Sequence, residues 1–254
     1  MSRTLVIGDI HGGLKALKQV LERAGITIAD HLIFLGDYVD GWSDSAATVD
    51  FLITLSQQHK TTYIRGNHDD LVYQYLSGKP MSSKWMQHGG AASKKGYDQF
   101  SKEQIAQHIH FYENLHDYYI DSDNRMYCHA GFQNVNGPKH EWYSTAFYWD
   151  RTLWEMVCAM QVDIEPSSLF YPKRLQLFKE VYIGHTPVTR IGETTPVQKA
   201  NVWNIDTGAA FKGAISIIDV TSKEYWQSDP VWQLYPDEIG RNELSYSHMQ
   251  VVKQ

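Results

Sequence analysis

The sequence predicts an α/β fold built on a largely parallel β-sheet. Short apolar or β-branched segments at residues 4–7, 32–35 and 61–64 alternate with segments at 14–24 and 46–55, whose apolar residues recur at helical spacing. Short apolar strands separated by helices are typical of βαβ units in which both faces of the sheet are covered. Each of the three strands is followed by glycine and then by polar residues, so we expect a ligand site at their carboxyl ends.

The remaining segments add a second set of elements to this unit. Residues 82–100, which carry a Gly-Gly break at 89–90, and residues 102–115 have helical character, and residues 143–180 are again rich in predicted helix. Segments 125–128, 181–183, 202–205 and 214–220 resemble strands and predict a second sheet. No linker divides the chain, so we expect a single domain over residues 1–254, with an aromatic tail at 221–254 whose role is not readable.

Composition excludes several classes of protein. Of the 254 residues, 43% are hydrophobic and 20% are charged, which is ordinary for a globular protein. The net charge of −6 argues against a nucleic-acid polymer as partner. No apolar run approaches the ~20 residues of a membrane span, and the N-terminus lacks the apolar region of a signal peptide. The two cysteines give no disulfide framework, so we expect a cytoplasmic protein without a membrane partner, whose oligomeric state is left open.

The ends of five predicted strands carry side chains that bind metals. The polar residues that follow these strands are Asp9, His11, Asp37, Asp40, Asn67, His68, His129 and His185. Carboxylate, amide and imidazole donors without thiolate suit Mn, Fe or Zn. Paired divalent ions lower the pKa of bound water and stabilise in-line displacement at phosphorus, so water is expected to be the nucleophile.

The ordered motifs resemble those of the calcineurin-like metallophosphoesterases, and within them the phosphoprotein phosphatase branch with its bacterial and phage serine/threonine phosphatases. The motifs are Gly8-Asp9-Ile10-His11-Gly12, Gly36-Asp37-Tyr38-Val39-Asp40, Gly66-Asn67-His68-Asp69, Cys128-His129-Ala130-Gly131 and Gly184-His185-Thr186. With the later segment around residues 205–216, the resemblance covers about residues 3–220. It implies a four-layer sandwich in which two mixed β-sheets are flanked by helices.

The same resemblance implies a role for each site residue. Two divalent metal ions, with Mn²⁺ as the first choice and Fe or Zn as alternatives, would be held by Asp9, His11, Asp37, Asn67, His129 and His185, with Asp37 as the bridging ligand. His68 would protonate the leaving alkoxide, and Asp40 would orient it. Arg151 and Asn67 would bind the substrate phosphate, since arginine pairs with phosphate through two parallel hydrogen bonds.

One position departs from the family pattern. The family continues the Gly36–Asp40 motif with arginine, but this sequence has Gly41 and then Trp42. Arg65, Arg151 or another basic residue would have to replace the missing arginine, or else the substrate differs. Trp42 could stack on a nucleobase, which keeps a dinucleotide substrate open.

These observations predict a metal-dependent phosphomonoester hydrolase. The first expectation is a protein phosphatase acting on phosphoserine or phosphothreonine, and possible activity on phosphotyrosine is included. The alternative is a diadenosine polyphosphate hydrolase or nucleotide phosphatase with a small phosphoester substrate. An inactive metal-binding regulator is the alternative from another class, and the intact set of site residues argues against it.

Overall fold

Two five-stranded sheets form the centre of the computed structural model, which describes residues 2–161 and 163–242. Sheet 1 has the strand order β10-β9-β1-β2-β3 and sheet 2 the order β4-β5-β6-β8-β7. The strands of sheet 1 are β1 (Thr4–Ile7), β2 (His31–Phe34), β3 (Lys60–Tyr63), β9 (Ser216–Asp219) and β10 (Tyr225–Gln227). The strands of sheet 2 are β4 (Tyr118–Ile120), β5 (Arg125–Cys128), β6 (Glu180–Ile183), β7 (Val197–Lys199) and β8 (Val202–Asn204).

Both sheets are mixed, with a parallel centre. Strands β1, β2 and β3 are parallel, and β9 and β10 extend this sheet in antiparallel fashion. Strands β5, β6 and β8 are parallel, and β4 and β7 form antiparallel edges. The parallel strands of each sheet therefore place their carboxyl ends together, as the sequence predicted for the first three.

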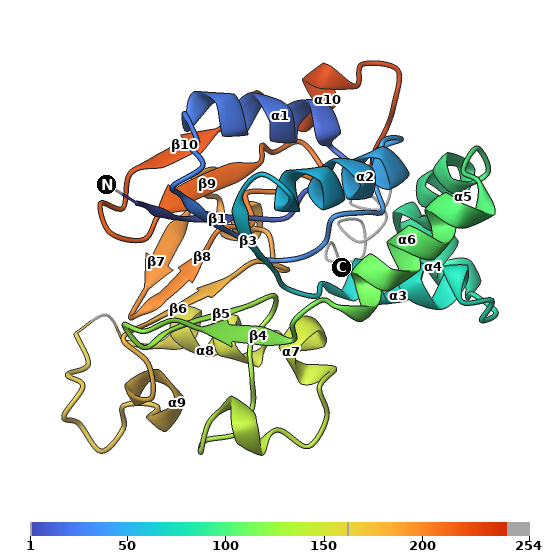
Figure 1. Cartoon of the computed structure of the whole chain (residues 1–254). Coiled ribbons are helices and arrows are strands. Elements are labelled where there is room, and N and C mark those ends of the chain that lie inside the picture. The colour runs from blue at the N-terminus through green and yellow to red at the C-terminus, as the bar shows by residue number, and fades with distance from the viewer. Residues whose placement is uncertain (1, 162, 243–254) are drawn as a thin grey trace, which may run out of the picture.

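Helices cover the outer face of each sheet and one end of the sandwich (Figure 1). Over sheet 1 lie α1 (Leu14–Arg23), α2 (Ser45–Ser56) and α10 (Val231–Leu234); beside them lie α3 (Asn67–Leu76), α4 (Ser83–Trp85), α5 (Ala91–Tyr97) and α6 (Lys102–Glu113). Below sheet 2 lie α7 (Ala146–Trp149), α8 (Thr152–Ala159) and α9 (Lys173–Gln176). The result is the four-layer α/β arrangement with two mixed sheets that the sequence predicted.

Alternation along the strands explains why the predicted strands are apolar on both faces. In β1, Leu5 and Ile7 pack in the cluster that includes Leu17 of α1, whereas Val6 packs between the sheets. The cluster between the sheets joins Val6 to Tyr127 and Tyr182 of sheet 2. Because successive side chains of a strand point to opposite faces, a strand buried on both sides must be apolar throughout.

The structure also contains elements that the sequence analysis missed. The expected strands agree with β1, β2, β3, β5, β6, β8 and β9 to within about two residues at most ends. Strands β4, β7 and β10, three residues each, were not predicted, and the tail region contributes both β10 and α10. The expected break at 89–90 is real, because Gly89 has φ of +104° and a π-helical turn over Met86–Gly90 separates α4 from α5.

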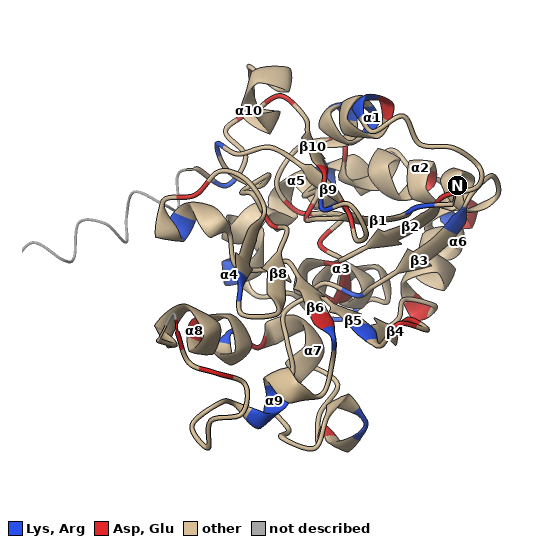
Figure 2. Cartoon of the chain, turned by 90° about the vertical axis from the view of Figure 1, so that its left-hand side faces the viewer, with Lys and Arg blue, Asp and Glu red and all other residues tan. Residues whose placement is uncertain are grey.

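No helix among the described residues is long and apolar enough to cross a membrane. In the view of Figure 2, basic and acidic residues are interspersed along the ribbon. The picture agrees with the mixed charge of the sequence, which contains 23 Lys and Arg and 29 Asp and Glu residues.

Candidate metal centre and active site

The loops that follow the parallel strands of both sheets meet at one place. Asp9 follows β1, Asp37 follows β2 and Asn67 begins α3 after β3, while His129 and His185 follow β5 and β6 of sheet 2. All five side chains are buried. The structure therefore brings together residues that lie up to 176 positions apart, such as Asp9 and the backbone N–H of His185, which donates to its carboxylate at 3.2 Å.

The backbone at this place is held in an uncommon conformation. His11, Asp37, Asp40 and His185 have positive φ values of 52°, 54°, 66° and 69°. Non-glycine residues with positive φ are uncommon and cost on the order of 1–3 kcal/mol each, so they persist where the surrounding structure determines them. Four such residues in one cluster mark it as a candidate functional site.

Hydrogen bonds to backbone carbonyls fix which nitrogen of two histidines faces the cluster. Nδ1 of His11 lies 2.8 Å from the carbonyl oxygen of Asp40, and Nδ1 of His129 lies 2.8 Å from that of Leu35. Because a carbonyl oxygen only accepts, each Nδ1 carries a proton, and in the neutral ring Nε2 is a lone-pair donor. This arrangement is the one that metal-binding histidines adopt.

The atoms around Nε2 of His129 fit a cation. Within 3.4 Å of it lie Asn67 Oδ1 at 3.3 Å, His185 Nδ1 at 3.2 Å and Asp37 Oδ1 at 3.4 Å. Acceptor atoms that face one another repel unless a proton or a metal ion lies between them. Nε2 of His185 is buried and has no hydrogen-bond partner among the described residues, which shows that protein groups alone do not satisfy this ring.

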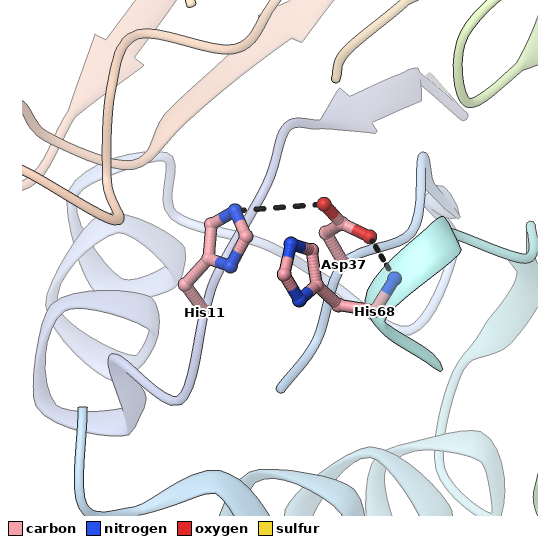
Figure 3. A group of neighbouring side chains, drawn as sticks. All are labelled: His11, Asp37 and His68. Atoms are coloured by element: carbon pink, nitrogen blue, oxygen red, sulfur yellow. Dashed lines mark hydrogen bonds and ion pairs between the residues drawn. The ribbon is translucent and has the colours of Figure 1, made fainter. Parts of the chain in front are cut away.

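Asp37 lies between two groups of candidate ligands. Its Oδ1 faces His129, and its Oδ2 lies 3.6 Å from Nε2 of His11. The same Nε2 of His11 lies 3.7 Å from Asp9 Oδ2. One group whose ligand atoms lie within 4.8 Å of one another joins Asp37 to His129 and His185, and a second joins it to His11 and His68 (Figure 3). Asp37 is therefore the residue that both groups share.

His68 occupies a place that suits either a ligand or a proton donor. Its Nδ1 lies 2.8 Å from Asp40 Oδ2, which also accepts from Nε1 of Trp85 at 2.7 Å. The other carboxylate oxygen of Asp40 accepts from Ser93 Oγ at 2.5 Å. Asp40 is fully buried and bonded to three side chains, and one of them, His68, also lines the cavity.

Burial and neighbouring charges strongly shift the pKa values of the titratable groups in the cluster. Burial and the charge of Asp206 raise the pKa of Asp9 well above its usual range. Against the effect of burial, His129 and His68 hold the pKa of Asp37 well below that range. Burial disfavours protonation of His129, yet the charges of Asp37 and Asp9 raise the pKa of His129 to about 9. Buried carboxylates at this density demand positive charge beside them.

A cavity of about 340 Å³ opens onto this cluster. Its wall carries four basic side chains, those of Lys84, Arg151, Arg190 and Arg241. Arg151, which the sequence analysis assigned to phosphate binding, reaches the cavity and donates from Nη1 to Thr186 Oγ1 at 2.7 Å. Burial and the charge of Arg190 lower the pKa of Arg151.

Trp42 does not lie in the cavity, so its expected role as a platform for a base is wrong. Its side chain is fully buried, its Nε1 donates to the carbonyl oxygen of Ala209 at 2.8 Å, and its ring stacks on Tyr235 with centroids 5.5 Å apart. Arg65 also lies elsewhere: it bonds the carbonyl oxygen of Leu115 and is 3.6 Å from Asp117.

Several residues that line the cavity were not assigned a role from the sequence. Asp206 follows β8 as Asp9 follows β1, so the rule of strand ends would have found it. Phe211 and Arg241 carry no such signal, because they lie in loops far from the five motifs. Trp149, 46% exposed, lines the cavity with its ring 6.5 Å from that of His185.

Two curated relatives and a solved structure are similar to most of this chain. A bis(5'-nucleosyl)-tetraphosphatase PrpE of the asymmetrical type from Anoxybacillus flavithermus is 27% identical, over 84% of this chain and 88% of the relative. The protein of the same name from Oceanobacillus iheyensis is 25% identical, over 87% and 89%. A serine/threonine phosphatase structure from Saccharomyces cerevisiae with similarity to human phosphatase PP5 superposes with a TM-score of 0.59 at 15% identity, over 86% of this chain and 73% of that one.

The yeast likeness shows a shared fold. The calcineurin-like phosphoesterase family model matches residues 2–194, which include all five strand-end motifs. The chain therefore belongs to the calcineurin-like phosphoesterase family.

Proposed function

We propose that this protein hydrolyses dinucleoside polyphosphates and releases two unequal nucleotides. The observation that carries the proposal is the cavity wall, which places four basic side chains beside the aromatic rings of Trp149 and Phe211. A chain of phosphates needs several cations, and a nucleobase stacks well on an aromatic ring. A single phosphoserine would leave most of these cations without a partner, so the protein phosphatase expectation has less support than its alternative.

The named relatives support the same substrate class. Both curated relatives cover more than four fifths of this chain and are asymmetrical bis(5'-nucleosyl)-tetraphosphatases by name.

We assign the metal ligands as the sequence predicted, with Mn²⁺ as the first candidate. Asp9, His11 and Asp37 would hold one ion, and Asp37, Asn67, His129 and His185 would hold the other. Divalent ions supply a nucleophilic water near neutral pH and neutralise charge on phosphate oxygens. The lone pairs that face one another around His129 are the feature of this chain that fits such ions.

The remaining roles belong to groups that surround the phosphate. Arg151 binds its oxygens, and Asn67 contributes its amide. His68 donates a proton from Nε2 to the leaving oxygen, and Asp40 orients the ring through Nδ1. Release of a nucleoside triphosphate needs this proton less than release of an alkoxide does, since the second pKa of a terminal phosphate is about 6.

The deciding experiment compares substrates at equal concentration with manganese-loaded protein. Diadenosine tetraphosphate and a phosphoserine peptide are each incubated, and nucleotides and inorganic phosphate are separated by anion-exchange chromatography. We expect ATP and AMP in equal amounts, with a kcat/KM well above that for the peptide. Two molecules of ADP would contradict asymmetric cleavage, preference for the peptide would restore the protein phosphatase expectation, and no turnover of either would favour a regulator.

A further inference from the structure

Arg241, a half-buried residue near the end of the described chain, brings a cation to the wall of the cavity. Its backbone N–H donates to the carbonyl oxygen of Ala210 at 3.0 Å, and its guanidinium carbon lies 5.3 Å from the centre of the Phe211 ring. Its Nε is buried and has no hydrogen-bond partner, and no carboxylate in the described part of the chain forms an ion pair with it. A buried guanidinium N–H without a partner is costly, so its retention at this place needs a reason.

The electrostatic surroundings point this cation toward the catalytic cluster. Burial lowers the pKa of Arg241, whereas the charges of Asp37 and Asp40 act in the opposite direction. The charge of Arg241 therefore interacts with residues that surround the reacting phosphate in the proposed function. Arg151 reaches the same cavity from another segment.

The segment that carries Arg241 is fixed to the loop after Asp40. The Glu238 carboxylate accepts from the backbone N–H and the hydroxyl of Ser43 at 2.8 and 2.6 Å. Tyr235 donates its hydroxyl hydrogen to Asp44 at 2.6 Å and stacks on Trp42. The loop thus covered begins at Gly41, where the sequence lacks an arginine, and the covering segment supplies one.

The backbone of the segment that carries Arg241 packs directly against Trp42, in the loop after Asp40. Gly240 has φ of +61°, and a Cβ at this position would lie 2.7 Å from the Trp42 ring. Only glycine combines this conformation with this contact, and it directly precedes Arg241. The position of the guanidinium is therefore set by a docked backbone.

We propose that Arg241 is a phosphate-binding residue of the active site, which binds the substrate phosphate together with Arg151 and stands in for the arginine absent at Gly41. The inference rests on phosphate hydrolysis at this cavity but not on which phosphate compound is the substrate. Two guanidinium groups and the metal ions would together surround the phosphate oxygens with positive charge.

Binding of inorganic phosphate tests the inference separately from the substrate. Phosphate affinity of the metal-loaded protein is measured by titration calorimetry, and bound metal is quantified in every variant. Arg241→Met should weaken phosphate binding by about 10- to 100-fold, in line with loss of a charged hydrogen bond, and Arg241→Lys should keep part of it. Lys212→Ala, which removes an exposed cation one residue from Phe211, is the matched control and should change affinity less than about twofold.

Three results would overturn the inference. These are phosphate affinity within twofold of wild type in Arg241→Met, equal weakening in Lys212→Ala, and loss of metal from Arg241→Met. Arg241→Gln provides a second variant should the methionine variant unfold, which circular dichroism reports. If the wild type binds phosphate through Arg241 but does not cleave diadenosine tetraphosphate, the proposed function fails and the inference stands.

Discussion

At the scale of single residues, distances alone allow His68 to be either a metal ligand or a proton donor. Its hydrogen bond to Asp40 favours the proton donor. His68 lies close enough to His11 and Asp37 to be a ligand, but its Nδ1 is engaged by a carboxylate that Trp85 also holds. A histidine oriented by a buried carboxylate presents its other nitrogen for proton transfer. Metal content and substrate dependence of one variant distinguish the two roles.

We expect His68→Asn to lower kcat/KM for a phosphoserine peptide by about 10²–10⁴-fold, because an alkoxide leaves poorly without a proton. For diadenosine tetraphosphate the loss should be roughly tenfold or less, since a terminal phosphate has a second pKa near 6 and leaves readily. Turnover of both substrates and bound metal are measured in parallel.

The exposed His140→Asn serves as the control and should match wild type in both measurements. Loss of metal from His68→Asn would make His68 a ligand. An equal loss on both substrates would contradict the leaving-group argument.

At the scale of elements, the strands that the sequence predicted are those whose own residues carry a distinctive pattern. Strands β1, β2 and β3 are buried on both faces or followed by glycine, so their composition is distinctive, and the residues after them were predicted as the site. The strands β4, β7 and β10 lie at sheet edges and span three residues each, too few to show an alternating pattern. They form because a neighbouring strand offers unpaired backbone groups, which is tertiary information.

The positions of Trp42 and Arg241 were beyond local reasoning for a related reason. Trp42 directly follows a ligand motif, so its chain position suggested the cavity, but Tyr235 and Gly240 cover it from the other end of the chain. Arg241 reaches the cavity only through the same docking. Contacts between segments some 200 residues apart leave no periodicity in the sequence.

Pairing of β1 with β2 depends on a buried carboxylate, which gives an element-scale prediction. Asp30 accepts from the backbone and guanidinium of Arg3 and from the backbone N–H of Thr27. Although burial opposes ionisation, these bonds hold the pKa of Asp30 well below its usual range. A carboxylate with a depressed pKa stabilises the fold above its unfolded pKa of about 3.9, and this stabilisation is lost as the pH falls through the folded value.

We therefore expect Asp30→Asn to lower the free energy of unfolding at pH 7 by about 1.5–3 kcal/mol. The difference from wild type should shrink as the pH falls below about 4, because the Asp30 carboxylate of the unfolded wild type then takes up a proton, whereas in the folded protein it stays charged until the pH reaches its depressed pKa. Urea unfolding at several pH values measures both effects.

The exposed pair of Arg23 and Asp229 offers the matched comparison, with side chains 41% and 47% exposed. Asp229→Asn should lower the free energy of unfolding far less than Asp30→Asn does, since exposed ion pairs contribute little. A difference between Asp30→Asn and wild type that does not change with pH would contradict the ionic explanation.

At the scale of the whole molecule, the candidate ligands come from both sheets. Asp9, Asp37 and Asn67 follow strands of sheet 1, whereas His129 and His185 follow strands of sheet 2. Metal ions at this place would join the two sheets at their shared edge, in addition to the apolar cluster that packs between them. Because unfolding separates the ligands, metal binding should appear as stability of the whole fold.

Removal and return of metal give the final prediction. Free Mn²⁺ at 100 times its Kd should raise the free energy of unfolding by about 2.7 kcal/mol for each site, or roughly 5–10 °C in Tm, and chelation should reverse this. Asp37→Asn should abolish the shift and both bound ions, because Asp37 belongs to both ligand groups. Asp70 lies in α3, which begins with the candidate ligand Asn67, but its carboxylate accepts from Gln74. Asp70→Asn should therefore keep the shift in Tm. Thermal unfolding with metal analysis measures all three, and a full shift with two bound ions in Asp37→Asn would show that the sheets are not joined through a shared carboxylate.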